Sequence, residues 1–261
     1  MMSRVIFWST VTFCTAFLAL PLLLVWPLAF NTSSFLTYPL EGLTLDWFHQ
    51  VLTQPTWVNA FLNSMKVALG AMVLALVIGG LAATGVILVP RVLQVVLTGL
   101  FISPIVVPTV VVGVAFAYAF GRAGIGGGYF SLVLAHAVLG TPLVFLSVLT
   151  SLRGLDPNLD LAGASMGASR GYRFRTITLP LALPGFAAGA VFAFITSFDE
   201  VVVALFLADP GSTTLPIALF AGLRDRLQPS IVVVAVLLSL VSLLFLVLLR
   251  RLQMRVAAPK S

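Results

Sequence analysis

Six long apolar stretches constrain this chain more than any other feature of its sequence. The six stretches cover residues 5–30, 67–89, 92–120, 129–152, 184–208 and 227–249, and all except 184–208 contain no Asp, Glu, Lys or Arg. A helix needs about 20 apolar residues to cross the hydrocarbon core of a bilayer. We therefore predict an all-α integral membrane protein with six transmembrane helices, built as a single domain over residues 1–261.

The scarcity of charge excludes several classes of protein. Only 8% of the residues are charged and 60% are hydrophobic, whereas soluble globular domains carry about 25% charged residues. The single cysteine, Cys14, excludes an intrachain disulfide, and no Cys/His cluster offers a metal site. The net charge of +6 does not indicate a nucleic-acid partner, because the basic residues are scattered between apolar stretches. We expect no metal and no cofactor in this chain.

The positions of the basic residues predict the orientation in the membrane. Segment 31–59 has no Lys or Arg, whereas Pro90-Arg91 forms a short basic turn, so the first is predicted outside and the second inside. Both termini are then cytoplasmic. Ten of the 14 basic residues fall on the inner side: Arg4, Arg91, Arg153, Arg170, Arg173, Arg175, Arg250, Arg251, Arg255 and Lys260.

Prolines inside two of the stretches predict bent helices. Pro21 and Pro27 lie in the first stretch, and Pro104 and Pro108 lie in the third. A proline removes a backbone donor and its ring clashes with the preceding turn, so each helix is expected to kink.

The inner segment 153–183 is too long for a simple turn. Asp156 followed by Pro157 is typical of a helix N-cap and first turn, and predicts a helix over 158–166. Gly167 is expected to end it.

A second short helix is predicted over 169–178, with its arginines facing water. Pro180 and Pro184 are expected to end it and to begin the fifth stretch as a new helix. The result is a helix-turn-helix on the cytoplasmic face. On physical grounds alone, it is either a surface loop whose arginines enforce topology or an element that docks a partner.

Two parts of this loop carry a family resemblance. The first is Leu161-Ala162-Gly163-Ala164-Ser165-Met166-Gly167-Ala168-Ser169, and the second is Ile177-Thr178-Leu179-Pro180. They resemble the EAA loop of binding-protein-dependent ABC importer permeases, which is a coupling helix held in a groove of an ATP-hydrolysing subunit. The resemblance implies ATPase coupling by Leu161, Ala162, Gly163, Ala164, Ser165, Met166, Gly167 and Ala168.

The match to the EAA pattern has two departures. Leu161 stands where the family pattern begins with Glu, and Gly163 replaces its second Ala. Asp160 does not substitute for that Glu, because one residue along a helix is about 100° around it. With Leu161 at this position, the contact with the ATP-hydrolysing subunit is expected to be more apolar than in the family pattern.

The resemblance extends over nearly the whole chain and is to the spermidine/putrescine type of permease. It rests further on Ser197-Phe198-Asp199-Glu200, on Asp209-Pro210-Gly211 with Thr214-Leu215-Pro216, and on the segment 57–64. It implies a type I ABC importer permease fold, a multi-pass location in the bacterial inner membrane, and alternating access.

The same resemblance implies partners. The chain has no G-x-x-x-x-G-K-[ST] motif, so ATP-Mg is expected on an ABC ATPase dimer. Six spans are too few for a complete pathway, so a second permease is expected, either a homologous chain or a second copy. An extracytoplasmic substrate-binding protein is also implied. The segment 209–228, with an apolar run over 215–223, is either its contact or a simple connector.

Asp199 and Glu200 are the acids of the fifth stretch. A charge deep in a membrane helix costs about 2.5 to 3.5 kcal/mol, so both must face protein or water. Helical spacing places Thr196 and Glu200 on one arc with the small residues Gly185, Gly189 and Ala193, and Asp199 at its edge. We predict that Thr196, Asp199 and Glu200 border the substrate pathway and attract ammonium groups. In the alternative, an acid pairs with Lys66, Arg122 or a partner subunit and only orders the bundle.

Other functions compete with this interpretation. An ABC permease for another solute, such as ferric ion or an amino acid, has the same features, and an ion-coupled secondary transporter also uses membrane carboxylates. Paired internal halves, which would favour that transporter, are absent. An aspartyl intramembrane protease needs acids on two spans, and only the fifth stretch has any. No catalytic residue is predicted, and His136 is expected to hydrogen-bond another helix.

Overall fold

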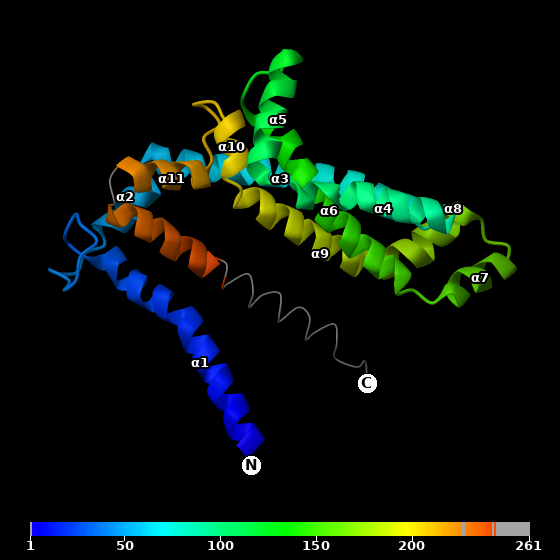
Figure 1. Cartoon of the computed structure of the whole chain (residues 1–261), viewed down its shortest axis with the longest axis horizontal. Helices are drawn as coiled ribbons and strands as arrows, with labels where there is room; N and C mark the ends of the chain where they lie inside the picture. The colour runs from blue at the N-terminus through cyan, green and yellow to red at the C-terminus, as the bar shows by residue number, and fades with distance from the viewer. Residues whose placement is uncertain (1, 226–227, 242, 244–261) are drawn as a thin grey trace. The chain divides into compact units, whose positions relative to one another are not determined.

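The computed structural model describes residues 2–225, 228–241 and 243, and these are almost entirely helical (Figure 1). The only pairing of extended chain among them is an isolated bridge between Asn31 and Leu43. The chain forms two compact units, one of Met1–Val58 with Leu219–Ser261, and one of Asn59–Ala218. The second unit contains every predicted site residue.

The first unit begins with two consecutive helical segments. These are α1 (Met2–Val25) and the 3-10 helix η1 (Trp26–Phe30), followed by α2 (Asp46–Thr53) inside the predicted outer segment. A further apolar helix runs over Pro229–Val241. The sixth predicted stretch, 227–249, lies partly outside the described residues.

A buried asparagine organises the loop between η1 and α2. The side-chain oxygen of Asn31 accepts hydrogen bonds from the backbone N–H groups of Ser33 at 3.4 Å and Glu41 at 3.0 Å. Its backbone carbonyl accepts one from the indole Nε1 of Trp47 at 2.9 Å. Because Asn31 is fully buried, these bonds replace those it would make with water, and they fix the start of α2.

The second unit holds the remaining helices, whose bounds follow in chain order. They are α3 (Pro55–Val86), α4 (Arg91–Val106), α5 (Thr109–Arg122), α6 (Tyr129–Arg153), α7 (Pro157–Ser165), α8 (Arg170–Arg173), the π-helix η2 (Phe174–Thr178), α9 (Leu179–Phe198), α10 (Val202–Leu207) and α11 (Leu215–Asp225). The start of α3 and the end of α11 belong to the first unit.

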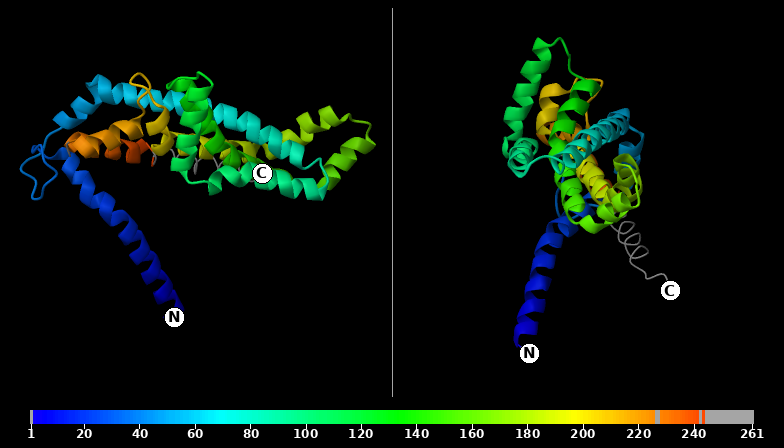
Figure 2. Two further views of the ribbon diagram at one scale, coloured as in Figure 1. Left: turned by 45° about the horizontal axis from the view of Figure 1, so that its top comes forward. Right: turned by 90° about the vertical axis from the view of Figure 1, so that its right-hand side faces the viewer.

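Helix α6 is the centre of this unit, and α9 lies along it in each view (Figures 1 and 2). One core cluster joins Val144, Phe145 and Val148 of α6 to alanines of α3 and α9. A second joins Leu132 and Ala135, nearer the start of α6, to α10. Most residues of α6 are buried, which agrees with the lack of charged residues in the stretch 129–152.

Glycines allow α9 to approach α6 closely. A Cβ added at Gly189 would lie 2.9 Å from the Cα of Val144, and one added at Gly185 would overlap the side chain of Ser151. Small residues at a helix contact let the two backbones pack tightly without side chains between them. The α6–α9 pair therefore has little room to slide or rotate.

The third predicted stretch, 92–120, is not one straight helix. It divides into α4 and α5, which are bent by 98° at a break. Val107 has an extended conformation before Pro108, which begins the next helix, as expected because a proline disfavours the helical conformation of the preceding residue. Pro104 remains inside α4, so only one of the two predicted kink sites is a break.

The fifth predicted stretch, 184–208, does not coincide with a single helix. One continuous helical run extends from Arg170 to Phe198 through α8, η2 and α9, so the prolines do not end the helix. The π-helical turn η2 ends at Thr178, two residues before Pro180, which has no backbone N–H to donate to the helical pattern. The run then ends at Asp199, and α10 starts at Val202.

The first, second and fourth stretches correspond to long helices with shifted ends. α3 begins 12 residues before position 67, and α6 extends one residue beyond 152. Among the described residues, four helices are long and apolar enough to cross a membrane, or five if the bent pair counts as one span. The count of six and the cytoplasmic location of the termini stay predictions.

We predict opposite effects of the same substitution at two glycines. Gly189→Ala should destabilise the protein by about 1 to 3 kcal/mol, because its Cβ meets the backbone of α6. Gly99→Ala should stabilise it by about 0.5 to 1 kcal/mol, because nothing lies within 4 Å of the added Cβ in the middle of α4. Thermal unfolding of the purified protein in detergent measures both. Equal effects of the two substitutions would contradict the close packing of α6 on α9.

Candidate functional site

The predicted first helix of the inner loop is α7. The carboxylate of Asp156 accepts a hydrogen bond from the backbone N–H of Asn158 at 2.9 Å, and Pro157 is the first residue of the helix. Asp156 thus satisfies one of the N–H groups that a helix leaves unpaired at its start. The predicted cap and first turn are confirmed at these residues.

Gly167 ends α7 as predicted, and its backbone shows why a glycine is needed. It has a φ of +79°, a conformation that costs residues with a Cβ about 1 to 2 kcal/mol. Its N–H donates to the carbonyl of Ala164 at 2.9 Å, and the N–H of Ala168 donates to that of Gly163 at 3.1 Å. This is the Schellman arrangement, which satisfies the last carbonyls of a helix.

The turn after α7 is closed by an ion pair. The Nε of Arg173 donates to Oδ1 of Asp160 at 2.8 Å, and its Nη2 donates to Oδ2 at 3.2 Å. Its Nη1 donates to the carbonyl of Ala168 at 2.7 Å. The side chain of Arg173 is only 14% exposed, so the prediction that all three loop arginines face water is wrong here. We refer to this Asp160–Arg173 pair as the clip.

The clip also accounts for a departure from the EAA pattern. A Cβ at Gly163 would lie 2.9 Å from Cδ of Arg173 and 3.1 Å from Cδ1 of Ile177. An alanine at this position would therefore press against the stem of the arginine that reaches Asp160. The second departure, Leu161, presents an exposed apolar side chain, as does Met166, which is 87% exposed.

A hollow of about 590 Å³ lies beside these residues, bordered among others by Met166, Tyr172 and Ile177. It is bounded by α7 on one side and by α8 and η2 on the other. Exposed apolar side chains next to a hollow are typical of a surface that receives another protein.

The run Arg170–Phe198 connects this loop to the predicted pathway residues. It is 29 residues long, which corresponds to roughly 40 Å at the rise of an α-helix. Asp199 caps its end, is exposed, and follows a last turn in which Thr196 is half-buried. The loop and the acids are thus opposite ends of a single helical rod, which we call the α8–α9 rod.

Thr196, Asp199 and Glu200, the predicted pathway residues, do not share one face of a helix in the structure. The buried face of α9 consists of Ala182, Gly185, Gly189, Ala193 and Ser197, so Ser197 takes the place predicted for Thr196. Glu200 is half-buried and lies beyond the helix end, where its Oε1 accepts a hydrogen bond from the N–H of Val203 at 2.9 Å. Glu200 therefore caps α10, a role that helical spacing did not predict.

The alternative of an internal ion pair receives no support within the described residues. Their one salt bridge is the clip. Lys66 instead lies 5.3 Å from the ring centroid of Tyr129, and Arg122 lies 5.9 Å from that of Tyr118, both in cation–π geometry.

A buried histidine next to the acids is confirmed as an interhelix contact. Nδ1 of His136, in α6, lies 2.9 Å from Oγ and 3.2 Å from the carbonyl oxygen of Ser197, in α9. Both side chains are buried.

A hydrogen-bonded clasp holds the predicted outer turn 209–214. Asn63 donates to two of its carbonyls, and the hydroxyl of Tyr129 bonds Asn63 and one of the same carbonyls. Ser64 accepts from the N–H of Leu215 at 2.8 Å. The turn is therefore tied to both α3 and α6.

Within that turn, the hydroxyl and N–H of Ser212 donate to Oδ1 of Asp209 at 2.7 and 2.8 Å. These bonds hold the pKa of Asp209 below its usual value. Because the pKa is lowered, the stabilisation is complete above the unfolded pKa, and it is lost only as the pH falls through the lower, folded value.

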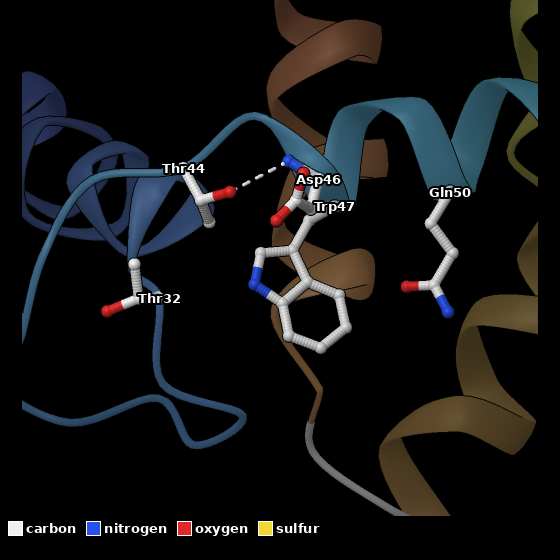
Figure 3. A pocket seen from close by; sticks show the side chains of 5 residues that line it. All are labelled: Thr32, Thr44, Asp46, Trp47 and Gln50. Atoms are coloured by element: carbon white, nitrogen blue, oxygen red, sulfur yellow. Dashed lines mark hydrogen bonds between the residues drawn. The ribbon is translucent and has the colours of Figure 1, made fainter.

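The first unit contains a separate polar hollow of about 370 Å³ (Figure 3). Among the side chains that line it, the indole of Trp47 lies between Thr32 and Thr44 on one side and Gln50 on the other, with Asp46 next to it. Sequence reasoning missed it, because its residues come from a loop and a short helix that no periodicity brings together.

Comparison with known proteins identifies the family. Residues 75–258 match the binding-protein-dependent transport system inner membrane components. This chain belongs to that family. It is therefore a multi-pass inner-membrane permease and a transport subunit, which decides against the intramembrane protease and the ion-coupled carrier.

Two curated relatives of this permease cover most of it. It is 28% identical over 89% of its length to the spermidine/putrescine transport system permease protein PotC of Haemophilus influenzae, and covers 90% of that protein. It is 30% identical over 85% of its length to the putrescine transport system permease protein PotI of Escherichia coli, and covers 81% of it.

A solved structure shows the same fold. It is a chain of a bacterial ABC transporter that imports the acidic polysaccharide alginate, and the TM-score is 0.67 over 98% of this permease and 97% of that chain. The sequence identity is 12%, so the likeness concerns the fold alone. The predicted all-α type I ABC importer permease fold is confirmed.

We predict that the clip holds α7 against α8. The hydrogen bonds from Arg173 lower the pKa of Asp160. Because the pKa is lowered in the folded state, the stabilisation that Asp160 gives to the fold is complete at neutral pH. It is lost as the pH falls through the lowered pKa. Asp160→Asn should therefore speed amide hydrogen exchange over 160–168 at neutral pH, as measured by mass spectrometry.

Asp156→Asn is the matched control, since it makes the same chemical change in the same loop. Asparagine caps helices about as well as aspartate, so exchange should stay at the wild-type rate. Equal exchange in wild type and Asp160→Asn at neutral pH would show that the clip does not restrain α7.

Proposed function

We propose that this permease is one of two membrane subunits of an ATP-driven importer, and that it conducts a polyamine such as putrescine or spermidine. The observation that carries this proposal is the similarity to two polyamine permeases over most of the chain. Two adjacent carboxylates at the end of the α8–α9 rod supply a matching chemistry, because they attract ammonium groups.

The partners follow from the same family. An ATPase dimer that binds ATP-Mg receives the loop Leu161 to Ala168, a second homologous permease completes the pathway, and an extracytoplasmic binding protein delivers the solute. The exposed Leu161 and Met166 are the apolar contacts to the ATPase, in place of the usual Glu. A second copy of this chain as the other permease is the alternative arrangement.

The mechanism is alternating access driven from the loop. Closure of the ATPase dimer displaces α7, and the clip and the Gly167 turn pass the displacement to the α8–α9 rod. Since the rod is packed on α6 through glycines, the two helices move as one body. The acids at the end of the rod then change the side of the membrane that they face. ATP binding thus shifts the equilibrium between an inward-facing and an outward-facing packing of the helices, and does not bend the helices themselves.

In this mechanism, Asp199 and Glu200 have different tasks. Asp199 is exposed, and its carboxylate has no hydrogen-bond partner among the described residues, so it is the direct contact for an ammonium group. Oε1 of Glu200 accepts the hydrogen bond from the N–H of Val203, and its other carboxylate oxygen faces the pathway. Thr196 borders the same side of the rod one turn earlier.

We predict that neutralising the acids lowers polyamine uptake. Asp199→Asn should raise the apparent KM for putrescine about tenfold, since each lost charge contact is worth roughly 1.4 kcal/mol. Glu200→Gln should have a smaller effect, because its amide oxygen still accepts from Val203. Radiolabelled uptake by cells that assemble the complex measures both.

The double variant, with both acids neutralised, should abolish saturable uptake at micromolar putrescine. Uptake and KM at wild-type values in the double variant would refute the cation pathway. Asp46→Asn is the control for surface charge, because Asp46 belongs to the other unit.

We also predict that the turn at Gly167 is needed for coupling. Gly167→Ala imposes a strain of about 1 to 2 kcal/mol, because its φ is +79°. It should lower the ratio of solute imported to ATP hydrolysed, as measured in proteoliposomes.

Gly124→Ala is the matched control, since Gly124 also has a positive φ, of +71°, and open space around it. It should leave that ratio unchanged. A wild-type ratio in Gly167→Ala, or an equal fall in both variants, would overturn the coupling role of the loop.

A further inference from the structure

The contact between His136 and Ser197 has no part in the mechanism given above, yet it lies two residues before Asp199. His136 is 1% exposed and comes from α6, and Ser197 comes from the last turn of α9. An ionisable side chain is costly in a membrane interior and usually serves a purpose there.

The backbone carbonyl of Ser197 is one of the last four of α9, which ends at Phe198. Such carbonyls have no helical N–H partner, and an unpaired carbonyl inside a membrane is unfavourable. A carbonyl oxygen only accepts, so its 3.2 Å contact with Nδ1 of His136 is a hydrogen bond in the tautomer that has the proton on Nδ1. The hydroxyl of Ser197, 2.9 Å from the same nitrogen, can accept from that proton as well. The imidazole thus replaces the missing N–H at the end of the helix.

The other ring nitrogen agrees with this assignment. Nε2 of His136 is buried and has no hydrogen-bond partner. In the neutral ring with a proton on Nδ1, Nε2 carries only a lone pair. Within the described residues, the side chain of His136 therefore makes hydrogen bonds with Ser197 alone.

The chain after Ser197 is fixed on the same helix. Val203 and Ala204 of α10 are fully buried in the cluster that contains Leu132 and Ala135 of α6. The turn that carries the acids is thus fastened to α6 at both ends, by the histidine before it and by apolar packing after it.

We propose that His136 is a positioning residue, whose Nδ1–H caps the end of α9 and so determines where Asp199 and Glu200 stand. The functional consequence rests on the proposed cation pathway, but the position of the acids is measurable without transport. The single cysteine of the chain, Cys14, makes this measurement direct.

The test uses the assembled transporter in membranes, with Cys14→Ser and Asp199→Cys. The rate of modification of the new thiol by a charged methanethiosulfonate reagent is measured with His136 and with His136→Asn, His136→Gln and His136→Leu. Asparagine places an amide N–H where Nδ1–H lies, so its rate should stay within about twofold of the wild-type rate. Leucine leaves the carbonyl unpaired and should change the rate about fivefold or more.

Glutamine distinguishes the two ring nitrogens, because its amide reaches the position of Nε2 and not that of Nδ1. It should behave as leucine does. Equal rates in all four proteins, or a rate for asparagine equal to that for leucine, would overturn the proposal. If leucine prevents assembly, the asparagine and glutamine variants decide, and loss of assembly in both overturns the positioning role.

A double-mutant cycle separates positioning from general stability. In the chain with native Cys14, His136→Leu and Asp199→Asn are combined, and uptake is measured. If His136 acts by placing the acids, its effect should shrink by about threefold or more in the Asp199→Asn background, whereas independent effects multiply. Multiplied losses would overturn the functional part. If Glu200→Gln and Asp199→Asn leave uptake unchanged, the proposed pathway fails, while the labelling rates still decide the position.

Discussion

The close packing of α9 on α6 is the constraint on which the rest of the site depends. Glycines at 185 and 189 bring the two backbones together, and a buried hydrogen bond joins them again at Ser197. In a membrane, helices gain little from the hydrophobic effect, so contact of this kind and interhelix hydrogen bonds hold them. The pair is stiff because there is no layer of flexible side chains between its members.

This stiffness gives the proposed mechanism its physical basis. A displacement at α7 reaches the acids only if each connection on the way resists deformation. The clip and the Gly167 turn form the first connection, the continuous run Arg170–Phe198 the second, and the contacts with α6 keep the run from bending. Within the run Arg170–Phe198, the π-helical turn η2 departs from α-helical geometry, and it lies beside the loop rather than beside the acids.

Much of this could be predicted from the sequence, and the rest could not for identifiable reasons. Local signals predicted α7, because Asp156-Pro157 and Gly167 act through backbone bonds within a few residues. The end of α9 could not be predicted from hydropathy, because Ser197 to Val201 lie inside an apolar stretch and Ser197 contacts His136, 61 positions earlier in the chain. The clip was missed for a similar reason, since Asp160 and Arg173 meet only across the folded turn. Helical spacing misplaced Glu200 because α9 ends at Phe198, before that residue is reached.

The most direct test of the account measures whether the α8–α9 rod moves as one body. Tyr172 and Phe192 are both exposed, and spin labels at these positions, with Cys14 replaced by serine, should lie about 30 Å apart along the helix. Pulsed dipolar spectroscopy of the assembled transporter, without nucleotide and with ATP trapped, gives this distance in the two states. The account predicts the same distance distribution in both. A second population or a shift of several ångströms when ATP binds would show that the rod bends at η2, and that the loop and the acids are not mechanically joined.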